Sequence, residues 1–192
     1  MSIWWWVRHG PTHAKGFVGR TDIPADLSDI SALERLNHYL PDDALVISSD
    51  LKRASATADA IQRTRQRLPH AKALREMDFG DWETRDFKDV AKTDPEISRA
   101  FWTDPSTATP PGGESWLQVS NRVTSQVDTI IREYAPKHVI AVAHVGVIIS
   151  QLQHAGKMPP SSAMSFTIDN LSVTRLEFLG PEWRVLGVNH LP

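Results

Sequence analysis

Three short apolar runs divide the chain, and each of them ends abruptly in polar residues. They occupy residues 3–7, 44–47 and 138–143. A continuous apolar run of this length lacks the alternation of a half-exposed strand and is typical of a strand that is covered on both faces. The runs therefore predict strands of a mostly parallel sheet. Within the first strand, the side chain of Trp5 should point away from those of Trp4 and Trp6.

In the segments between and after these runs, apolar residues recur at longer spacings than the two-residue repeat of a strand. Residues 115–134 carry apolar side chains at spacings of three and four, which predicts an amphipathic helix. Further helices are expected over residues 28–39 and 51–66, the second capped by Ser49 or Asp50. Alternating strands and helices of this kind predict the α/β fold class.

The C-terminal quarter favours strands joined by tight turns. Residues 165–168 and 172–178 flank the turn residues 169–170, and residues 183–188 form one more candidate strand. Residues 103–113 are rich in Pro and Thr and are expected to form a loop over a site.

Composition narrows the class of protein. The chain has 192 residues, of which 41% are hydrophobic and 23% are charged, and we expect one domain spanning residues 1–192. The formal net charge of -2 gives no electrostatic footprint for nucleic acid or for an anionic membrane. Cysteine is absent, which excludes disulfides and thiolate chemistry. The apolar run at 3–7 is too short for a signal peptide or a membrane span, so we expect a cytoplasmic protein. We expect it to be a monomer or a homodimer.

Basic side chains gather where the predicted strands end. Arg8 and His9 follow the first strand, Arg53 follows the second by a few residues, and His144 follows the third. In a parallel sheet, ligands bind beyond the carboxyl ends of the strands. These side chains are therefore expected to meet at one edge of the sheet.

The chemistry of this group fits phosphoryl transfer. Arg8 and Arg53 can each bind phosphate oxygens through two N–H groups. The neutral imidazole of His9 can attack phosphorus and form a phosphohistidine that water then hydrolyses. Together with a protonated His144, the guanidiniums would supply the positive charge that a magnesium ion supplies elsewhere. Glu76, next to Phe79, is the candidate that protonates the leaving oxygen, since a carboxyl group against an apolar wall keeps its proton more readily.

Taken singly, each of these residues has an ordinary structural explanation. Arg53 alone reads as a solvated helix residue, Glu76 as a surface carboxylate and His144 as a residue that packs at a strand end. A zinc site is disfavoured, because no pair of the eight histidines has the His-Glu-x-x-His spacing. We therefore expect neither a metal nor a cofactor.

Ordered motifs add a family resemblance. Residues 7–12 read Val-Arg-His-Gly-Pro-Thr, which resembles the opening signature of the histidine phosphatase superfamily, also called phosphoglycerate mutase-like. Segments 49–58, 74–83, 112–115 and 144–148 are similar to its later motifs, in the same order. The resemblance implies a three-layer α/β/α sandwich with one mostly parallel central sheet.

The resemblance also implies roles. It makes His9 the phosphorylated residue, Glu76 the proton donor and His144 the second catalytic histidine. The implied catalytic or phosphate-binding residues beside them are Arg8, Arg53, Thr12 and Val145. Departures from the family pattern at residues 15–17, 22–28 and 84 lie in loops around the leaving group and bear on substrate identity.

Within the superfamily, the sequence is most similar to the branch of alpha-ribazole phosphatases and broad-specificity phosphatases. This similarity predicts a metal-independent phosphomonoesterase that acts on a small phosphorylated metabolite, such as alpha-ribazole phosphate or a sugar phosphate. The alternatives are a phosphotransferase of the phosphoglycerate mutase type, or a phosphate-binding module without turnover.

Overall fold

The computed structural model describes residues 1–106 and 108–192. A six-stranded sheet formed by these residues lies at the centre of the molecule. The strands, in the order β3-β2-β4-β1-β5-β6 across the sheet, are β3 (Gln66–Arg67), β2 (Leu45–Ser48), β4 (His138–Ala143), β1 (Ser2–Arg8), β5 (Val173–Phe178) and β6 (Trp183–His190). The four strands β3, β2, β4 and β1 are parallel, whereas β5 runs antiparallel to both of its neighbours. The prediction of a mostly parallel sheet is thus confirmed.

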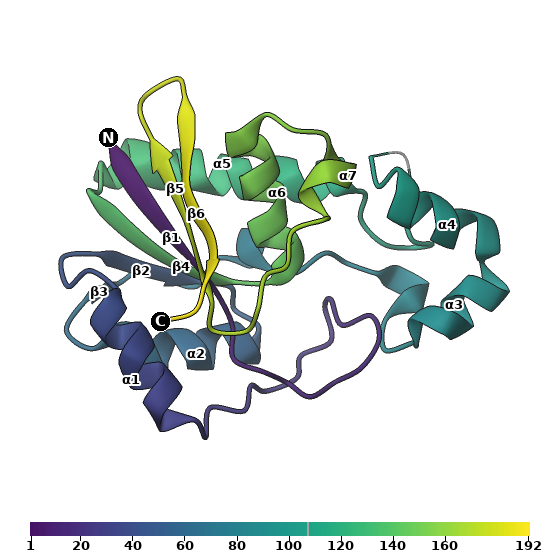
Figure 1. Ribbon diagram of the computed structural model, residues 1–192, viewed down its shortest axis with the longest axis horizontal. Helices are drawn as coiled ribbons and strands as arrows, with labels where there is room; N and C mark the ends of the chain where they lie inside the picture. The colour runs from purple at the N-terminus through teal and green to yellow at the C-terminus, as the bar shows by residue number, and fades with distance from the viewer. Residues whose placement is uncertain (107) are drawn as a thin grey trace.

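Helices cover both faces of the sheet, as Figure 1 shows. The helices α1 (Ile30–Tyr39) and α2 (Lys52–Gln62) pack on one face, and α5 (Trp116–Tyr134) and α6 (Val145–Gly156) pack on the other. Each helix pair buries its own apolar cluster against the strands. The expected three-layer α/β/α sandwich is confirmed.

The three consecutive tryptophans of β1 show why both faces need a cover. Trp4 and Trp6 are fully buried on the α5–α6 side, where their rings stack with centroids 5.4 Å apart. Trp5 points to the other face and contacts Tyr39 of α1. The strand alternation predicted for these side chains is therefore observed.

Two further helices lie away from the sheet. The helices α3 (Phe87–Thr93) and α4 (Pro95–Thr103) form an arm at the right of Figure 1, and the short helix α7 (Pro160–Ala163) follows α6. The arm was not predicted from the sequence. The expected loop 103–113 leads from this arm to α5, and residue 107 of it lies outside the described residues.

Three sequence predictions need correction. The helix expected over 51–66 ends at Gln62, because Arg63 adopts a left-handed backbone conformation with φ of 49°. Neither Ser49 nor Asp50, the two predicted caps, caps this helix with its side chain. Instead, the carboxylate of Asp22, from another segment, accepts a hydrogen bond from Lys52 N at 2.7 Å. Residues 165–168 form no strand, and the carbonyl of Ile168 instead accepts a bond from a side chain.

No helix in residues 1–106 and 108–192 combines the length and the apolar character needed to cross a membrane.

Candidate active site

The site lies where β1 and β4 end side by side. Arg8, the last residue of β1, is in register with Ala143, the last residue of β4. The next residue on each strand is a histidine, and the ring centroids of His9 and His144 lie 5.1 Å apart. The parallel register of the two strands thus brings together residues that are far apart in sequence.

His9 is held in one tautomer and without charge. Its Nδ1 lies 2.7 Å from the carbonyl oxygen of Gly10, which can only accept, so Nδ1 carries the proton and Nε2 keeps its lone pair. Burial, with a smaller contribution from the nearby guanidiniums of Arg53 and Arg8, lowers the pKa of His9 to about 3, and the hydrogen bond to the Gly10 carbonyl only partly opposes this shift. At neutral pH the ring is therefore uncharged, with a free lone pair on Nε2.

Arg53 lies in the first turn of α2 and is only 1% exposed. Its guanidinium donates to the carbonyl oxygens of Gly19 and Thr21 at 2.7 and 2.8 Å. Its Nε donates to Nδ1 of His144 at 3.2 Å. The arginine is thereby fixed in place between the loop at residues 19–21 and the second histidine.

The charge expected on His144 is not what the structure shows. The ring is fully buried, and burial together with the neighbouring His9 and Arg53 lowers the pKa of His144 well below its ordinary value. Because Nδ1 accepts a hydrogen bond from Arg53, the proton of the neutral ring sits on Nε2. His144 therefore offers a neutral N–H donor beside His9, and the predicted protonated form is wrong for the free protein.

Two buried donors next to His9 have no hydrogen-bond partner among the described residues. They are Nε of Arg8 and Nε2 of His144. The rest of the Arg8 guanidinium is oriented by a 2.6 Å bond from Nη1 to the carbonyl oxygen of Ile168. Buried polar groups are normally paired, so unpaired donors beside a cavity are suited to an anionic ligand.

Glu76 reaches the site from the segment after β3. It is 3% exposed, and its two carboxylate oxygens accept bonds from the backbone N–H groups of Met77 at 2.8 Å and Gly146 at 3.0 Å. A Cβ atom at Gly146 would lie 2.5 Å from Oε1 of Glu76, so only glycine lets the carboxylate come this close to the start of α6. Arg122 of α5 donates to the Glu76 carbonyl oxygen at 3.1 Å.

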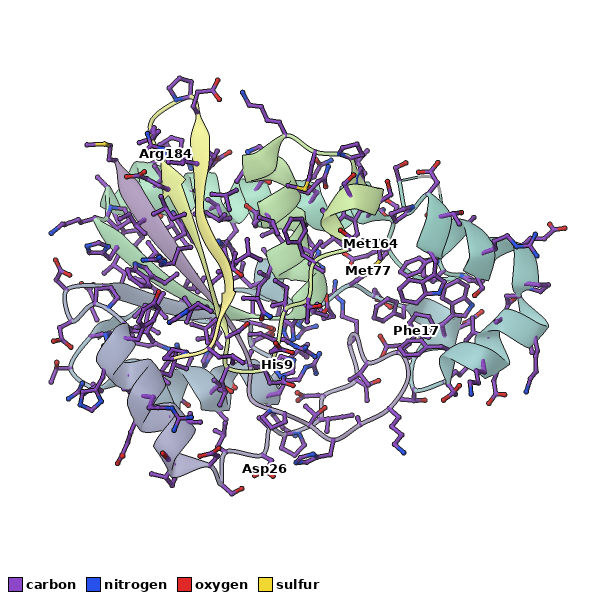
Figure 2. The ribbon with its side chains drawn as sticks, viewed as in Figure 1. His9, Phe17, Asp26, Met77, Met164 and Arg184 are labelled. Carbon is purple, nitrogen blue, oxygen red and sulfur yellow. The ribbon has the colours of Figure 1, made fainter. Side chains whose placement is uncertain are left out.

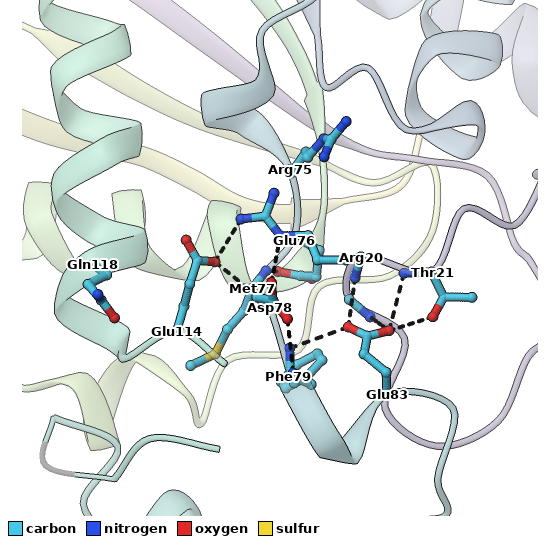
Figure 3. A network of polar contacts seen from close by, with 12 residues as sticks. Arg20, Thr21, Arg75, Glu76, Met77, Asp78, Phe79, Glu83, Glu114 and Gln118 are labelled. Atoms are coloured by element: carbon cyan, nitrogen blue, oxygen red, sulfur yellow. Dashed lines mark hydrogen bonds and ion pairs between the residues drawn. The ribbon is translucent and has the colours of Figure 1, made fainter. Parts of the chain in front are cut away.

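A second carboxylate, Glu83, organises the loop that holds Arg53 (Figure 3). It accepts bonds from the backbone N–H groups of Gly19, Arg20, Thr21 and Phe79 at 2.7 to 3.3 Å. The Thr21 hydroxyl adds a bond of 2.6 Å. Burial alone would raise the pKa of Glu83, but these hydrogen bonds hold it below its ordinary value. The ionised carboxylate thus fixes the two carbonyl groups that bind the guanidinium.

A cavity of about 450 Å³ lies beside Arg8, His9, Arg53 and Glu76. Of the residues singled out in the sequence, the structure places Arg8, His9, Thr12, Arg53, Glu76 and Val145 in its lining. His144 is fully buried next to His9. The described residues contain no group of three or more His, Asp or Glu side chains arranged to hold a metal ion.

Some residues around the site were not found from the sequence. Thr57 accepts a bond from the Gly10 N–H at 3.0 Å, and the Asn170 side chain donates to the His9 carbonyl oxygen at 2.7 Å. Glu83 was within a recognised motif, but its role depends on a loop more than sixty residues earlier in the chain. Long-range contacts of this kind leave no periodic signal in a sequence.

Comparison with known proteins agrees with this geometry. The model of the histidine phosphatase superfamily (branch 1) matches residues 4–191. The adenosylcobalamin/alpha-ribazole phosphatase of Escherichia coli is 30% identical over 172 residues, which cover 86% of this chain and 84% of that protein. A metal-independent phosphoserine phosphatase of Arabidopsis thaliana is 32% identical over 169 residues, covering 79% and 70%.

A solved structure extends the likeness to the fold. The structure of Bacillus stearothermophilus YhfR superposes with a TM-score of 0.88 at 25% identity, over 97% of this chain and 96% of that one. The family resemblance seen in the motifs is thereby confirmed. The chain belongs to the histidine phosphatase superfamily and is a phosphatase.

Proposed function

We propose that the protein is a metal-independent phosphomonoesterase that works through a phosphohistidine at His9. In the first step Nε2 of His9 attacks phosphorus, an N–P bond forms, and the P–O bond to the alcohol breaks while Glu76 protonates the leaving oxygen. In the second step water attacks the phosphorus, gives its proton to Glu76, and the N–P bond breaks to release inorganic phosphate.

The observation that carries the proposal is the state of His9. Its Nδ1 is bound to the Gly10 carbonyl, its low pKa keeps the ring neutral, and it lines the cavity together with both guanidiniums. Phosphoryl transfer requires mainly positioning and donors around the phosphoryl oxygens. Arg8, Arg53, the Nε2–H of His144 and the N-terminal end of α6 supply these donors.

The proposed substrate is a small phosphorylated metabolite, with alpha-ribazole phosphate and sugar phosphates as candidates. The relatives support this class, since one is an adenosylcobalamin/alpha-ribazole phosphatase and another is a phosphoserine phosphatase. Thr12 and Val145 line the cavity and are proposed to contact the phosphate beside the charged residues.

The direct test replaces the nucleophile. We expect His9→Ala to lower the turnover of p-nitrophenyl phosphate at least about 1000-fold, because no other group can carry the phosphoryl intermediate. His38→Ala, an exposed histidine on α1, is the matched control and should keep full activity. Trapping with labelled substrate should give an acid-labile phosphoprotein in the wild type only, and activity retained in His9→Ala would end the covalent mechanism.

Two other outcomes separate the alternative functions. With 3-phosphoglycerate, isomerisation that outpaces phosphate release would identify a mutase. Binding of inorganic phosphate without turnover of any ester would identify a binding module.

A further inference from the structure

The cavity has two chemically different ends. At the end near His9, the charged side chains of its lining are Arg8, Arg53 and Glu76, and we call this part the phosphate end. The other part, here called the aromatic end, is lined by ring side chains from four separate segments: Phe17, Phe79, Phe87, Phe101, Trp102 and Phe166. Figure 2 shows Phe17 on the side of the molecule where α3 and α4 lie, apart from His9.

Phe17 is the centre of the aromatic end. It is 3% exposed, and its ring centroid lies 5.0 Å from that of Phe79 and 4.6 Å from that of Phe87. The Trp102 ring lies nearly parallel to it, with centroids 6.3 Å apart and an interplanar angle of 28°. Fixed rings around a buried anchor form a surface suited to stacking and edge contacts with another flat ring.

Several rings of the aromatic end face solvent in the absence of a ligand. Phe87 is 46% exposed, Trp102 is 52% exposed and Phe166 is 39% exposed. Exposed rings that line a cavity are typical of a binding surface. Because the same cavity also contains the phosphate end, a ligand that fills it would place its phosphoryl group near His9 and its alcohol against these rings.

Charge and polarity narrow the leaving group further. Among the described lining residues, the charged side chains are Arg8, Arg53 and Glu76, all at the phosphate end, and the uncharged polar side chains apart from the indoles are His9, Thr12 and Thr167. A carboxylate on the leaving group would find no cationic side chain among the lining residues of the aromatic end. The hydroxyl groups of a sugar would find few side-chain partners there.

We infer that the preferred substrates are phosphomonoesters whose alcohol carries an aromatic ring, with this ring seated against the exposed rings of Phe87 and Trp102. The inference rests on the proposed function and selects within its substrate class. It ranks aryl-bearing esters above sugar phosphates and above phosphoglycerates.

The test compares esters whose leaving alcohols are chemically alike. For 2-phenylethyl phosphate against ethyl phosphate, we expect kcat/KM to differ about 10- to 100-fold, the value of burying one phenyl group. Because both esters release a primary alcohol, a difference of this size reports recognition of the ring. Equal values, or faster hydrolysis of glucose 6-phosphate, would overturn the inference.

Binding separates this inference from the proposed function. In 3-phenylpropylphosphonate and propylphosphonate a CH2 group replaces the ester oxygen, so calorimetry measures affinity without turnover. A preference of about 10-fold or more for the phenyl compound supports the aromatic end even if no ester is hydrolysed, which would defeat only the proposed function. Equal affinities would overturn the inference while the enzyme remains a phosphatase.

Two substitutions test whether the rings of the aromatic end cause the preference for the phenyl ester. Trp102→Ala, on the arm, and Phe166→Ala, on another segment, should each lower the phenyl-to-ethyl ratio of kcat/KM about 3- to 10-fold. Both side chains are substantially exposed, so the fold should tolerate their loss. Leu117→Ala removes a comparably exposed side chain from α5, outside the cavity lining, and should leave both the ratio and the activity unchanged. A ratio that stays constant in Trp102→Ala and Phe166→Ala would overturn the inference.

Discussion

At the scale of single residues, burial controls the reactivity of His9. The ring gives up the hydration that would stabilise its charged form, and the Gly10 carbonyl decides which nitrogen keeps the lone pair. The same burial lowers the pKa of His144, so two neutral rings lie side by side, with Arg53 bonded to His144. In the proposed mechanism a neutral His9 can attack phosphorus without first losing a proton.

The low pKa of His9 also makes stability depend on pH. In the unfolded chain this histidine binds a proton near its ordinary pKa of 6.5, whereas in the folded protein it does so only near 3. Between these values the unfolded state binds more protons, so the free energy of unfolding falls as the pH falls. Urea unfolding at pH 7 and at pH 4.5 should show a loss of a few kcal/mol in the wild type and a smaller loss in His9→Asn.

The role proposed for Glu76 gives a prediction about leaving groups. Glu76→Gln removes the proton donor and should slow alkyl phosphates about 100-fold. The same variant should slow p-nitrophenyl phosphate far less, because p-nitrophenolate leaves without a proton. Because Glu76 also accepts a proton from water in the second step, the measurement is the release of alcohol or phenol in the first turnover, which reports the first step alone. Equal losses on the two substrates would count against Glu76 as the acid.

At the scale of elements, the loop at residues 19–21 connects Glu83 to Arg53. We expect Glu83→Gln to raise the inhibition constant of inorganic phosphate about 10-fold. The amide NH2 group cannot accept the hydrogen bonds that the backbone N–H groups of this loop donate to Glu83, so the loop would hold Arg53 less firmly. The exposed Glu133→Gln on α5 is the matched control. A phosphate affinity that stays at the wild-type value would show that Arg53 is held without this carboxylate.

The sequence predicted those elements whose burial pattern is regular. The buried strands β1, β2 and β4 were found because each is a continuous apolar run that ends in polar residues, and α5 was found because one helical period extends over the whole element. The two-residue strand β3 and the seven-residue α3 were missed because elements this short carry little pattern. The nine-residue α4 is amphipathic and could have been found from its sequence.

Part of the site could also be predicted from the sequence. Arg8, His9 and His144 stand directly at strand ends, so their convergence follows from the order of the sheet. The aromatic end could not be predicted, because Phe17 and Phe166 come from irregular segments whose meeting depends on tertiary packing alone.

At the scale of the whole molecule, the sandwich carries the residues of the phosphate end, and the arm, which Figure 1 shows beside it, carries three rings of the aromatic end. Since guanidiniums and neutral N–H donors surround His9, positive charge is present at the phosphate end without a bound cation. Activity should therefore survive prolonged dialysis against EDTA, with a metal-dependent phosphatase treated in parallel as the control. A loss of activity that added Mg²⁺ or Zn²⁺ restores would contradict the proposed mechanism.

The stacked indoles of Trp4 and Trp6 have an optical consequence. Two identical chromophores held 5.4 Å apart at an interplanar angle of 22° share their excited states, and the coupled pair gives a far-ultraviolet circular dichroism couplet that a single indole lacks. The coupling depends on the extended backbone that places alternate side chains on one face. Separation of β1 from the sheet would abolish this signal, so the middle of the molecule carries its own spectroscopic reporter of folding.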